Sequence, residues 1–156
     1  MYKVYTIGDC YVAMGLINAN KRNYYEEAIN VINLGLDMVE IIKSVRKEIN
    51  FEELHMRIGI HTGQIYGGII GTDIVRYDIY GQDVLIANKM ESNGVEGRVM
   101  ISENTRSLIE PYNSKNHKYE LQFHKIVKIE KLQIEQKAFL VSRYSHSDVE
   151  DDSESV

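Results

Sequence analysis

The chain has 156 residues, which is the usual size of one domain and enough for a hydrophobic core without disulfide bonds. Its formal net charge of −5 is local, because five of its 23 acidic residues lie among the last nine and 18 lysines and arginines balance the rest. A neutral body excludes the basic footprint of a nucleic-acid-binding protein, and no apolar run reaches the roughly 20 residues of a membrane helix, so no direct membrane insertion is expected. A single cysteine excludes an internal disulfide and suits a reducing compartment.

A β-hairpin is predicted at the start of the chain. Two apolar runs, Lys3–Ile7 and Cys10–Met14, flank a Gly8-Asp9 pair, and a two-residue link of this type is a strong hairpin signal. The turn would hold the Asp9 carboxylate at a rigid tip, where it could bind a hard cation such as Mg²⁺. On turn chemistry alone, the simpler explanation is that Asp9 only forms the turn.

A long amphipathic helix is predicted from Tyr24 to about Ile49, after the polar loop Asn18–Asn23. Apolar residues recur along it at three- and four-residue steps, which indicates a stripe that packs on a core rather than on a partner. The stripe consists of Ala28, Ile32, Leu36, Val39, Ile42, Val45 and Ile49.

The second half of the chain alternates short strands with short helices, which predicts an α+β or mixed α/β domain. One helix is expected over Gln82–Asn93, with Val84, Ala87 and Met90 inward and Gly94 closing it. A shorter helix begins at Ser102-Glu103 and is expected to end near Pro111. The predicted strands are Met56–His61, Gln64–Ile70, Arg76–Tyr80, Val99–Ser102, Tyr119–Val127 and Ala138–Ser142.

The composition of the C-terminal segment sets the expected domain boundary. The acidic, serine-bearing segment 145–156 predicts a disordered tail, since such composition cannot form a core. The folded domain is therefore expected to cover residues 1–144.

Four segments, taken in order, resemble the class III nucleotide cyclases, the adenylate and guanylate cyclase family. They read YTIGDCYVAMG, MRIGIHTGQIYGGIIG, RYDIYGQDVLIANKMES and GRVMIS, and the resemblance extends from about Lys3 to Val141. It implies an α+β fold with a ferredoxin-like βαββαβ core and a mixed sheet flanked by helices. The first strand and first two helices of that fold would be missing from this chain. An unrelated α/β signalling domain with an acidic turn would explain none of the four segments.

The resemblance implies that Asp9 is a metal ligand. In this family the ribose 3′-hydroxyl of a nucleoside triphosphate attacks the α-phosphorus and pyrophosphate leaves, with help from two Mg²⁺ or Mn²⁺ ions. Two aspartates hold the ions. Asp9 matches the second aspartate, and the first would lie upstream of Met1. Gly8 and Gln64 fall at phosphate-binding positions, although Gln64 stands where an arginine is common and supplies no charge.

Active sites of this family form between two catalytic domains in a head-to-tail dimer, and in heterodimeric members one half supplies both metal aspartates. The other half supplies a base-reading pair together with an Asn and an Arg. Here the Asn and Arg positions hold Leu85, which cannot form hydrogen bonds, and Lys89, which lacks the guanidinium fork. The base-reading positions hold Tyr5 and Asp78. These four residues imply a degenerate second site, so the chain resembles the metal-supplying half.

The resemblance favours conversion of GTP to cyclic GMP in intracellular signalling, by analogy with large two-domain guanylate cyclases. Two alternatives remain open. One is an adenylate cyclase half that makes cyclic AMP from ATP, because the base-reading residues belong to the partner domain. The other is a catalytically silent, regulatory pseudocyclase. In each case the chain would be a cytoplasmic domain, which can belong to a membrane-anchored protein.

Two further residues within these segments are expected to be structural. His61, at a strand end, is expected to form structural hydrogen bonds rather than to act as a base. Cys10, beside Asp9, is expected to be packed under the hairpin rather than to be a reactive thiol.

Overall fold

The structure is a computed structural model, and it describes residues 1–15, 23–73 and 75–144. The predicted tail, 145–156, and most of the predicted loop Asn18–Asn23 lie outside these ranges. None of the helices in the described ranges combines the length and the apolarity needed to cross a bilayer.

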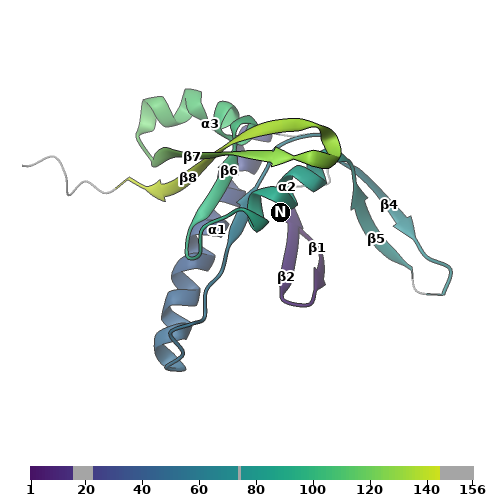
Figure 1. Cartoon of the computed structure of the whole chain (residues 1–156), viewed down its shortest axis with the longest axis horizontal. Coiled ribbons are helices and arrows are strands. Elements are labelled where there is room, and N and C mark those ends of the chain that lie inside the picture. The colour runs from purple at the N-terminus through teal and green to yellow at the C-terminus, as the bar shows by residue number, and fades with distance from the viewer. Residues whose placement is uncertain (16–22, 74, 145–156) are drawn as a thin grey trace, which may run out of the picture.

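A four-stranded mixed sheet forms the centre of the fold (Figure 1). Its strands lie in the order β3 (Ile58–Ile60), β6 (Val99–Ser102), β8 (Ile134–Arg143) and β7 (Tyr119–Ile129). The pair β3–β6 is parallel, whereas β6–β8 and β7–β8 are antiparallel. The predicted α+β class with a mixed sheet is therefore confirmed.

Alternate side chains of β6 belong to two hydrophobic clusters, one on each face of the sheet. Val99 and Ile101 pack with residues of α1 (Tyr24–Glu48) and α3 (Glu103–Asn116). Met100 packs with residues of α2 (Gln82–Ser92). Because successive side chains of a strand point to opposite faces, α1 and α3 cover one face and α2 covers the other.

Two antiparallel hairpins lie outside the four-stranded sheet. The first joins β1 (Tyr2–Ile7) to β2 (Cys10–Met14), with Gly8 at a φ of 58° in the turn, which confirms the predicted Gly-Asp hairpin. The second joins β4 (Tyr66–Ile70) to β5 (Arg76–Tyr80) and projects away from the rest of the molecule (Figure 1).

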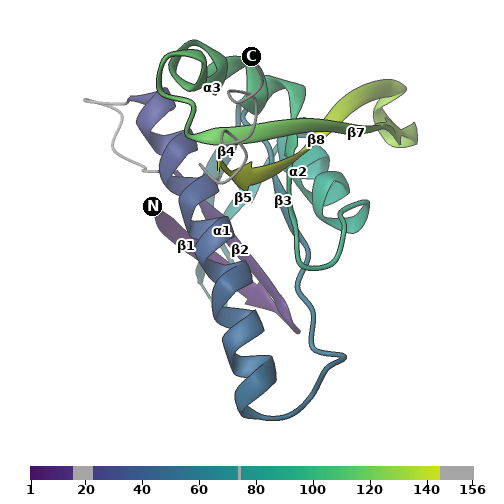
Figure 2. The same cartoon turned by 90° about the vertical axis from the view of Figure 1, so that its left-hand side faces the viewer.

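The helix α1 matches its prediction in length, but only part of its apolar stripe is buried. Asn23 caps its start by accepting a hydrogen bond from the backbone N of Glu26 at 3.2 Å. The stripe is buried from Ala28 to Val39, whereas Ile49, beyond the helix, is 55% exposed. Figure 2 shows the reason, since the last turns of α1 extend beyond the sheet on which the first turns pack.

The helix α3 corrects the expectation that Pro111 ends it. The helix begins after Ser102 as predicted, but it continues past Pro111 to Asn116 and ends at His117, whose φ is 46°. Proline removes one backbone donor. Ile109 is fully buried and Tyr112 packs against the same cluster, so core packing on both sides of the proline offsets the lost hydrogen bond.

Several other boundaries also differ from the prediction. The strands β7 and β8 pair along their whole length from Ile129↔Ile134 to Tyr119↔Arg143, so both are longer than expected. In α2, Met90 is buried as predicted, but its buried neighbour is Ile86 rather than Val84 or Ala87. Residues four apart share one helix face, and the face of Ile86 and Met90 is the one that lies on the sheet.

Candidate functional site

The Asp9 carboxylate lies at the exposed tip of the β1–β2 hairpin, directly after the left-handed Gly8. The backbone pair Ile7↔Cys10 closes the turn, so the position of the carboxylate is set by a short, paired ribbon. Within the described ranges, the Asp9 carboxylate forms no hydrogen bond or ion pair with another residue. A ligand in solution can therefore reach both carboxylate oxygens.

The donor chemistry of Asp9 suits a magnesium ion only in part. Within residues 1–15, 23–73 and 75–144, no three His, Cys, Asp or Glu side chains gather closely enough to hold a metal. Mg²⁺, however, is commonly bound through one or two carboxylates together with substrate phosphates and water. Asp9 thus fits as one protein ligand of an ion that a triphosphate and further ligands would complete.

Cys10 is exposed, which corrects the expectation that it packs under the hairpin. In β2 the residues next to the turn, Cys10 and Tyr11, are exposed, and the next three are half-buried. The tip of the hairpin therefore extends beyond the elements that cover its base, and burial does not protect the thiol.

Tyr5 and Asp78, the expected base-reading pair, are brought close together where β1 meets β5. Asp78 is buried, lies 3.4 Å from Nη2 of Arg76 and accepts a hydrogen bond from the backbone N of Ile79 at 2.8 Å. Burial, followed by the nearby Asp78 carboxylate, raises the pKa of the Tyr5 phenol. The pKa of Tyr80 is raised first by desolvation and then by its hydrogen bond with Asp78. The Asp78 carboxylate is thus already engaged by its own chain.

The other two residues of the expected second site lie on α2. Leu85 packs against the hydrophobic cluster of Met90 and Met100. Lys89 is half-buried, and its backbone oxygen accepts hydrogen bonds from both nitrogens of Asn93. Leucine has no hydrogen-bonding group, so α2 offers no donor or acceptor side chain at that position.

Gln64 is connected to α2 rather than to Asp9. Its backbone N donates to Oδ2 of Asp83 at 2.6 Å, and the side chain is exposed. The tip of the β1–β2 hairpin lies apart from α2 in both views (Figures 1 and 2). No described contact therefore joins the two residues that the sequence assigned to metal and phosphate.

Sequence reasoning missed Asp83, which stands at the centre of a polar network. Its Oδ1 lies 2.9 Å from Nε2 of His61, and Nδ1 of His61 lies 2.7 Å from Oγ of Ser102. The His61 side chain is 1% exposed, so it has the structural hydrogen-bonding role that was expected. An acidic residue in the first turn of a helix is an ordinary sequence feature, so no local signal marked Asp83.

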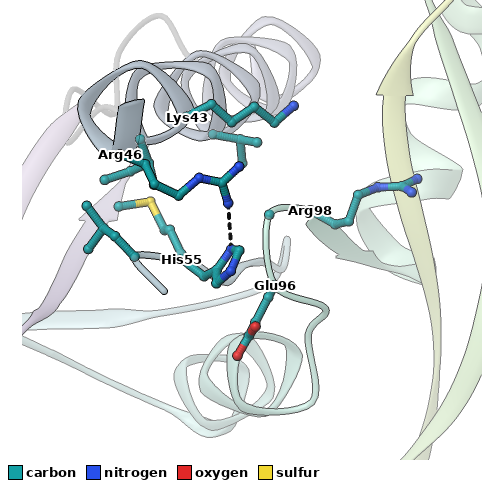
Figure 3. Close-up of a pocket in the computed structure, with 10 residues that line it drawn as sticks. Lys43, Arg46, His55, Glu96 and Arg98 are labelled. Carbon is teal, nitrogen blue, oxygen red and sulfur yellow. Dashed lines mark hydrogen bonds between the residues drawn. The ribbon is translucent and has the colours of Figure 1, made fainter. Parts of the chain in front are cut away.

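A surface pocket of about 310 Å³ lies at the far end of α1, but it contains none of the candidate residues (Figure 3). Arg46 contacts His55 there, with Nη1 3.4 Å from Nδ1, while Lys43 and Arg98 point outward from the rim. Arg46 also lies 3.5 Å from Glu52, which does not line the pocket, and the lining places Glu96 beside Lys43, Arg46 and Arg98. The described lining is therefore more basic than acidic, and it contains none of the residues assigned to nucleotide chemistry.

Comparison with known proteins gives a consistent result. Residues 1–142 match the family model described as "Adenylate and Guanylate cyclase catalytic domain". The chain is 41% identical over 109 residues to guanylate cyclase beta of Plasmodium falciparum and 38% identical over 112 residues to guanylate cyclase alpha of the same organism. These alignments cover 68% and 70% of this chain, which spans only 3% of the length of either relative.

Solved structures show the same similarity in three dimensions. The guanylate cyclase domain of RhGC from Catenaria anguillulae, in complex with GTP, superimposes with a TM-score of 0.74 at 26% sequence identity. The alignment covers 92% of this chain and 73% of that one. Together with the matched family model and the fold described above, this similarity shows that the chain belongs to the class III nucleotide cyclases, the adenylate and guanylate cyclase catalytic domain family.

Proposed function

We propose that this chain is the metal-binding half of a guanylate cyclase that converts GTP to cyclic GMP and pyrophosphate. The observation that carries the proposal is the free Asp9 carboxylate, held at a short paired turn inside a domain of the cyclase family. Preference for GTP is supported by the guanylate cyclases among its relatives and by the GTP complex of a structural neighbour.

In this proposal Asp9 holds a divalent ion near the triphosphate. When bound, the two metal ions of the family would activate the ribose 3′-hydroxyl and stabilise charge on the phosphates. The paired turn holds the Asp9 carboxylate in one position before the ion binds, and this preorganisation favours metal binding. Gly8 in the same turn and the exposed Gln64 are proposed phosphate contacts, and Gln64 could donate hydrogen bonds but no positive charge.

A second cyclase domain is needed to complete the site. The α2 positions that would act on the ribose and transition state hold Leu85, which packs on the core, and Lys89. The β4–β5 hairpin also exposes apolar side chains that a partner would cover. Among the described residues of this hairpin, the most exposed are Ile69 at 74%, Tyr66 at 65% and Val75 at 63%.

The test is Asp9→Asn in the full protein together with its partner domain, with Glu53→Gln as the control. Glu53 is an exposed acid in the segment between α1 and β3, so neutralising it changes the charge but not the hairpin. We expect Mg²⁺- or Mn²⁺-dependent cyclic GMP formation to be abolished by Asp9→Asn and unchanged by Glu53→Gln. Unchanged activity in Asp9→Asn would reduce Asp9 to a turn residue.

Two further outcomes would replace the proposal. Cyclic AMP formed from ATP in preference to cyclic GMP from GTP would make the chain part of an adenylate cyclase. Nucleotide binding by the intact wild-type protein, with no cyclic product from either nucleotide, would make it a regulatory pseudocyclase.

A further inference from the structure

The β4–β5 hairpin forms an arm that is attached to the body of the domain by very few contacts. The chain enters the arm through residues 61–65 and leaves it through Gly81, which precedes α2. Apart from their own pairing, the main contact that its strands make is that of β5 with β1. The direction in which the arm projects therefore depends strongly on how its entry and exit segments are held.

One carboxylate, that of Asp83, holds the entry segment against the start of α2. Its Oδ2 accepts from the backbone N of Gln64 at 2.6 Å, and its Oδ1 lies 2.9 Å from Nε2 of His61. Gly63 lies directly beneath it, since a Cβ at Gly63 would stand 2.7 Å from the Cβ of Asp83 and would overlap its carboxyl carbon. Only glycine allows this close approach of the two segments.

The same entry segment is tied to α3 from the other side. Nδ1 of His61 lies 2.7 Å from Oγ of Ser102, which also caps α3 by accepting from the backbone N of Thr105 at 3.4 Å. The hydroxyls of Thr62 and Thr105 lie 3.0 Å apart. Ser102 and Thr105 are fully buried, so loss of one partner leaves polar groups unpaired where water cannot replace it.

The exit of the arm lies beside its entry. Gly81 has a φ of 137°, a backbone conformation that residues with a side chain rarely adopt. A Cβ there would stand 3.2 Å from the backbone oxygen of Gln64. Asp83 follows two residues later in the first turn of α2. A single side chain thus connects the strand end before the arm with the helix after it.

We propose that Asp83 is a positioning residue that, through His61 and the backbone of Gln64, fixes the direction of the arm and thereby the placement of the second cyclase domain. The presence of a second cyclase domain rests on the proposed function. Asp83 itself touches no substrate in this assignment. Its effect on catalysis is transmitted by the geometry of the arm, whose exposed apolar residues would pack against the partner.

The test uses Asp83→Asn in the full protein with its partner domain. Asparagine keeps the size of the side chain but replaces one carboxylate oxygen with an NH₂ donor, so it cannot accept both at the position facing His61 and at the position facing the backbone N of Gln64. A milder variant, Thr62→Val, removes only the hydroxyl contact to Thr105. The control is Asp37→Asn, which breaks an exposed ion pair with Arg143 on the surface of α1.

The first readout is amide hydrogen exchange, which reports local opening independently of activity. We expect the amides of residues 64–81 to exchange about tenfold faster in Asp83→Asn, and less so in Thr62→Val, while β6 and β8 stay protected. Unchanged exchange of the arm would overturn the proposal. A uniform increase that includes β6 and β8 would also overturn it, because Asp83 would then act on global stability alone.

The second readout is cyclic nucleotide formation. We expect kcat to fall about tenfold in Asp83→Asn and to stay at the wild-type level in Asp37→Asn, because the site between two domains is sensitive to their alignment. Faster arm exchange with an unchanged kcat would refute the role in placing the partner. A wild-type protein without cyclase activity would contradict the proposed function, whereas the exchange experiment would still decide whether Asp83 holds the arm.

Discussion

The substitution Gly59→Ala should displace α2 from the sheet. A Cβ at Gly59 would stand 2.6 Å from the Cα of Glu91 and would overlap the backbone N of that residue, whereas ordinary contacts begin at 3.4 Å. The opposing atoms belong to the helix backbone, so no side-chain rotation relieves the overlap. The helix must therefore withdraw by about 1 Å, a gap that forfeits a quarter to a half of the dispersion energy of the side chains at the contact.

The cost follows from what α2 contributes to the core. Met90 is fully buried and Ile86 is 5% exposed, and both pack against the sheet at this contact. Overpacking of this kind costs about 3 kcal/mol, at the upper end of the usual range. For a chain of this length we expect the midpoint of thermal unfolding to fall by about 6–12 °C.

The assay is thermal unfolding of the purified chain followed by circular dichroism, with Gly68→Ala as the matched control. Gly68 lies in β4 with an ordinary backbone conformation, and a Cβ there would meet nothing within 4 Å. We expect Gly68→Ala to unfold within about 2 °C of wild type, as surface substitutions do. A Gly59→Ala variant as stable as Gly68→Ala would show that α2 does not lie directly on β3.

Three further predictions concern the stability of the domain. Asn23→Ala removes the cap of α1 and should lower the free energy of unfolding by about 1 kcal/mol, measured by urea denaturation, whereas Asn30→Ala on the exposed face of the same helix should not lower it. Met90→Ala should cost about 2–5 kcal/mol through the cavity that it leaves, and Met56→Ala, at a half-buried site, should cost clearly less; equal losses would contradict the described core. Burial and the neighbouring Tyr112 raise the pKa of Tyr25 to about 12. Its phenol ionises first in the unfolded chain, so the free energy of unfolding should fall between about pH 10 and 12. Tyr25→Phe should make that fall smaller, and an identical fall in urea midpoints between pH 9 and pH 11.5 would refute the assignment.

Local patterns predicted most elements because each depended on one dominant signal. The Gly8-Asp9 turn fixed the first hairpin, and the apolar period fixed the start and length of α1. The predicted end of α3 was wrong. Proline disfavours a helix locally, but the burial of Ile109 stabilises the helix on the core, and this burial exists only once the core has assembled. The exposure of Cys10 was missed for the same reason, since it depends on what covers the hairpin.

The candidate site divides in a similar way. Tyr5 and Asp78 were placed together by resemblance, and the fold brings them into electrostatic contact across β1 and β5. The assignments of Asp9 and Gln64 to metal and phosphate stay predictions. Asp83 was invisible because its role depends on His61 and Gln64, which are distant in sequence and meet only through the packing of α2 on β3.

The strand β6 has a consequence for how the domain melts. All four of its residues are buried, and its side chains alternate between the cluster under α1 and α3 and the cluster under α2. Neither cluster can come apart without exposing one side of this strand. The two faces should therefore unfold as a single cooperative unit. A substitution that weakens packing beneath α2 should also lower the stability of the packing beneath α1, on the opposite side of the sheet.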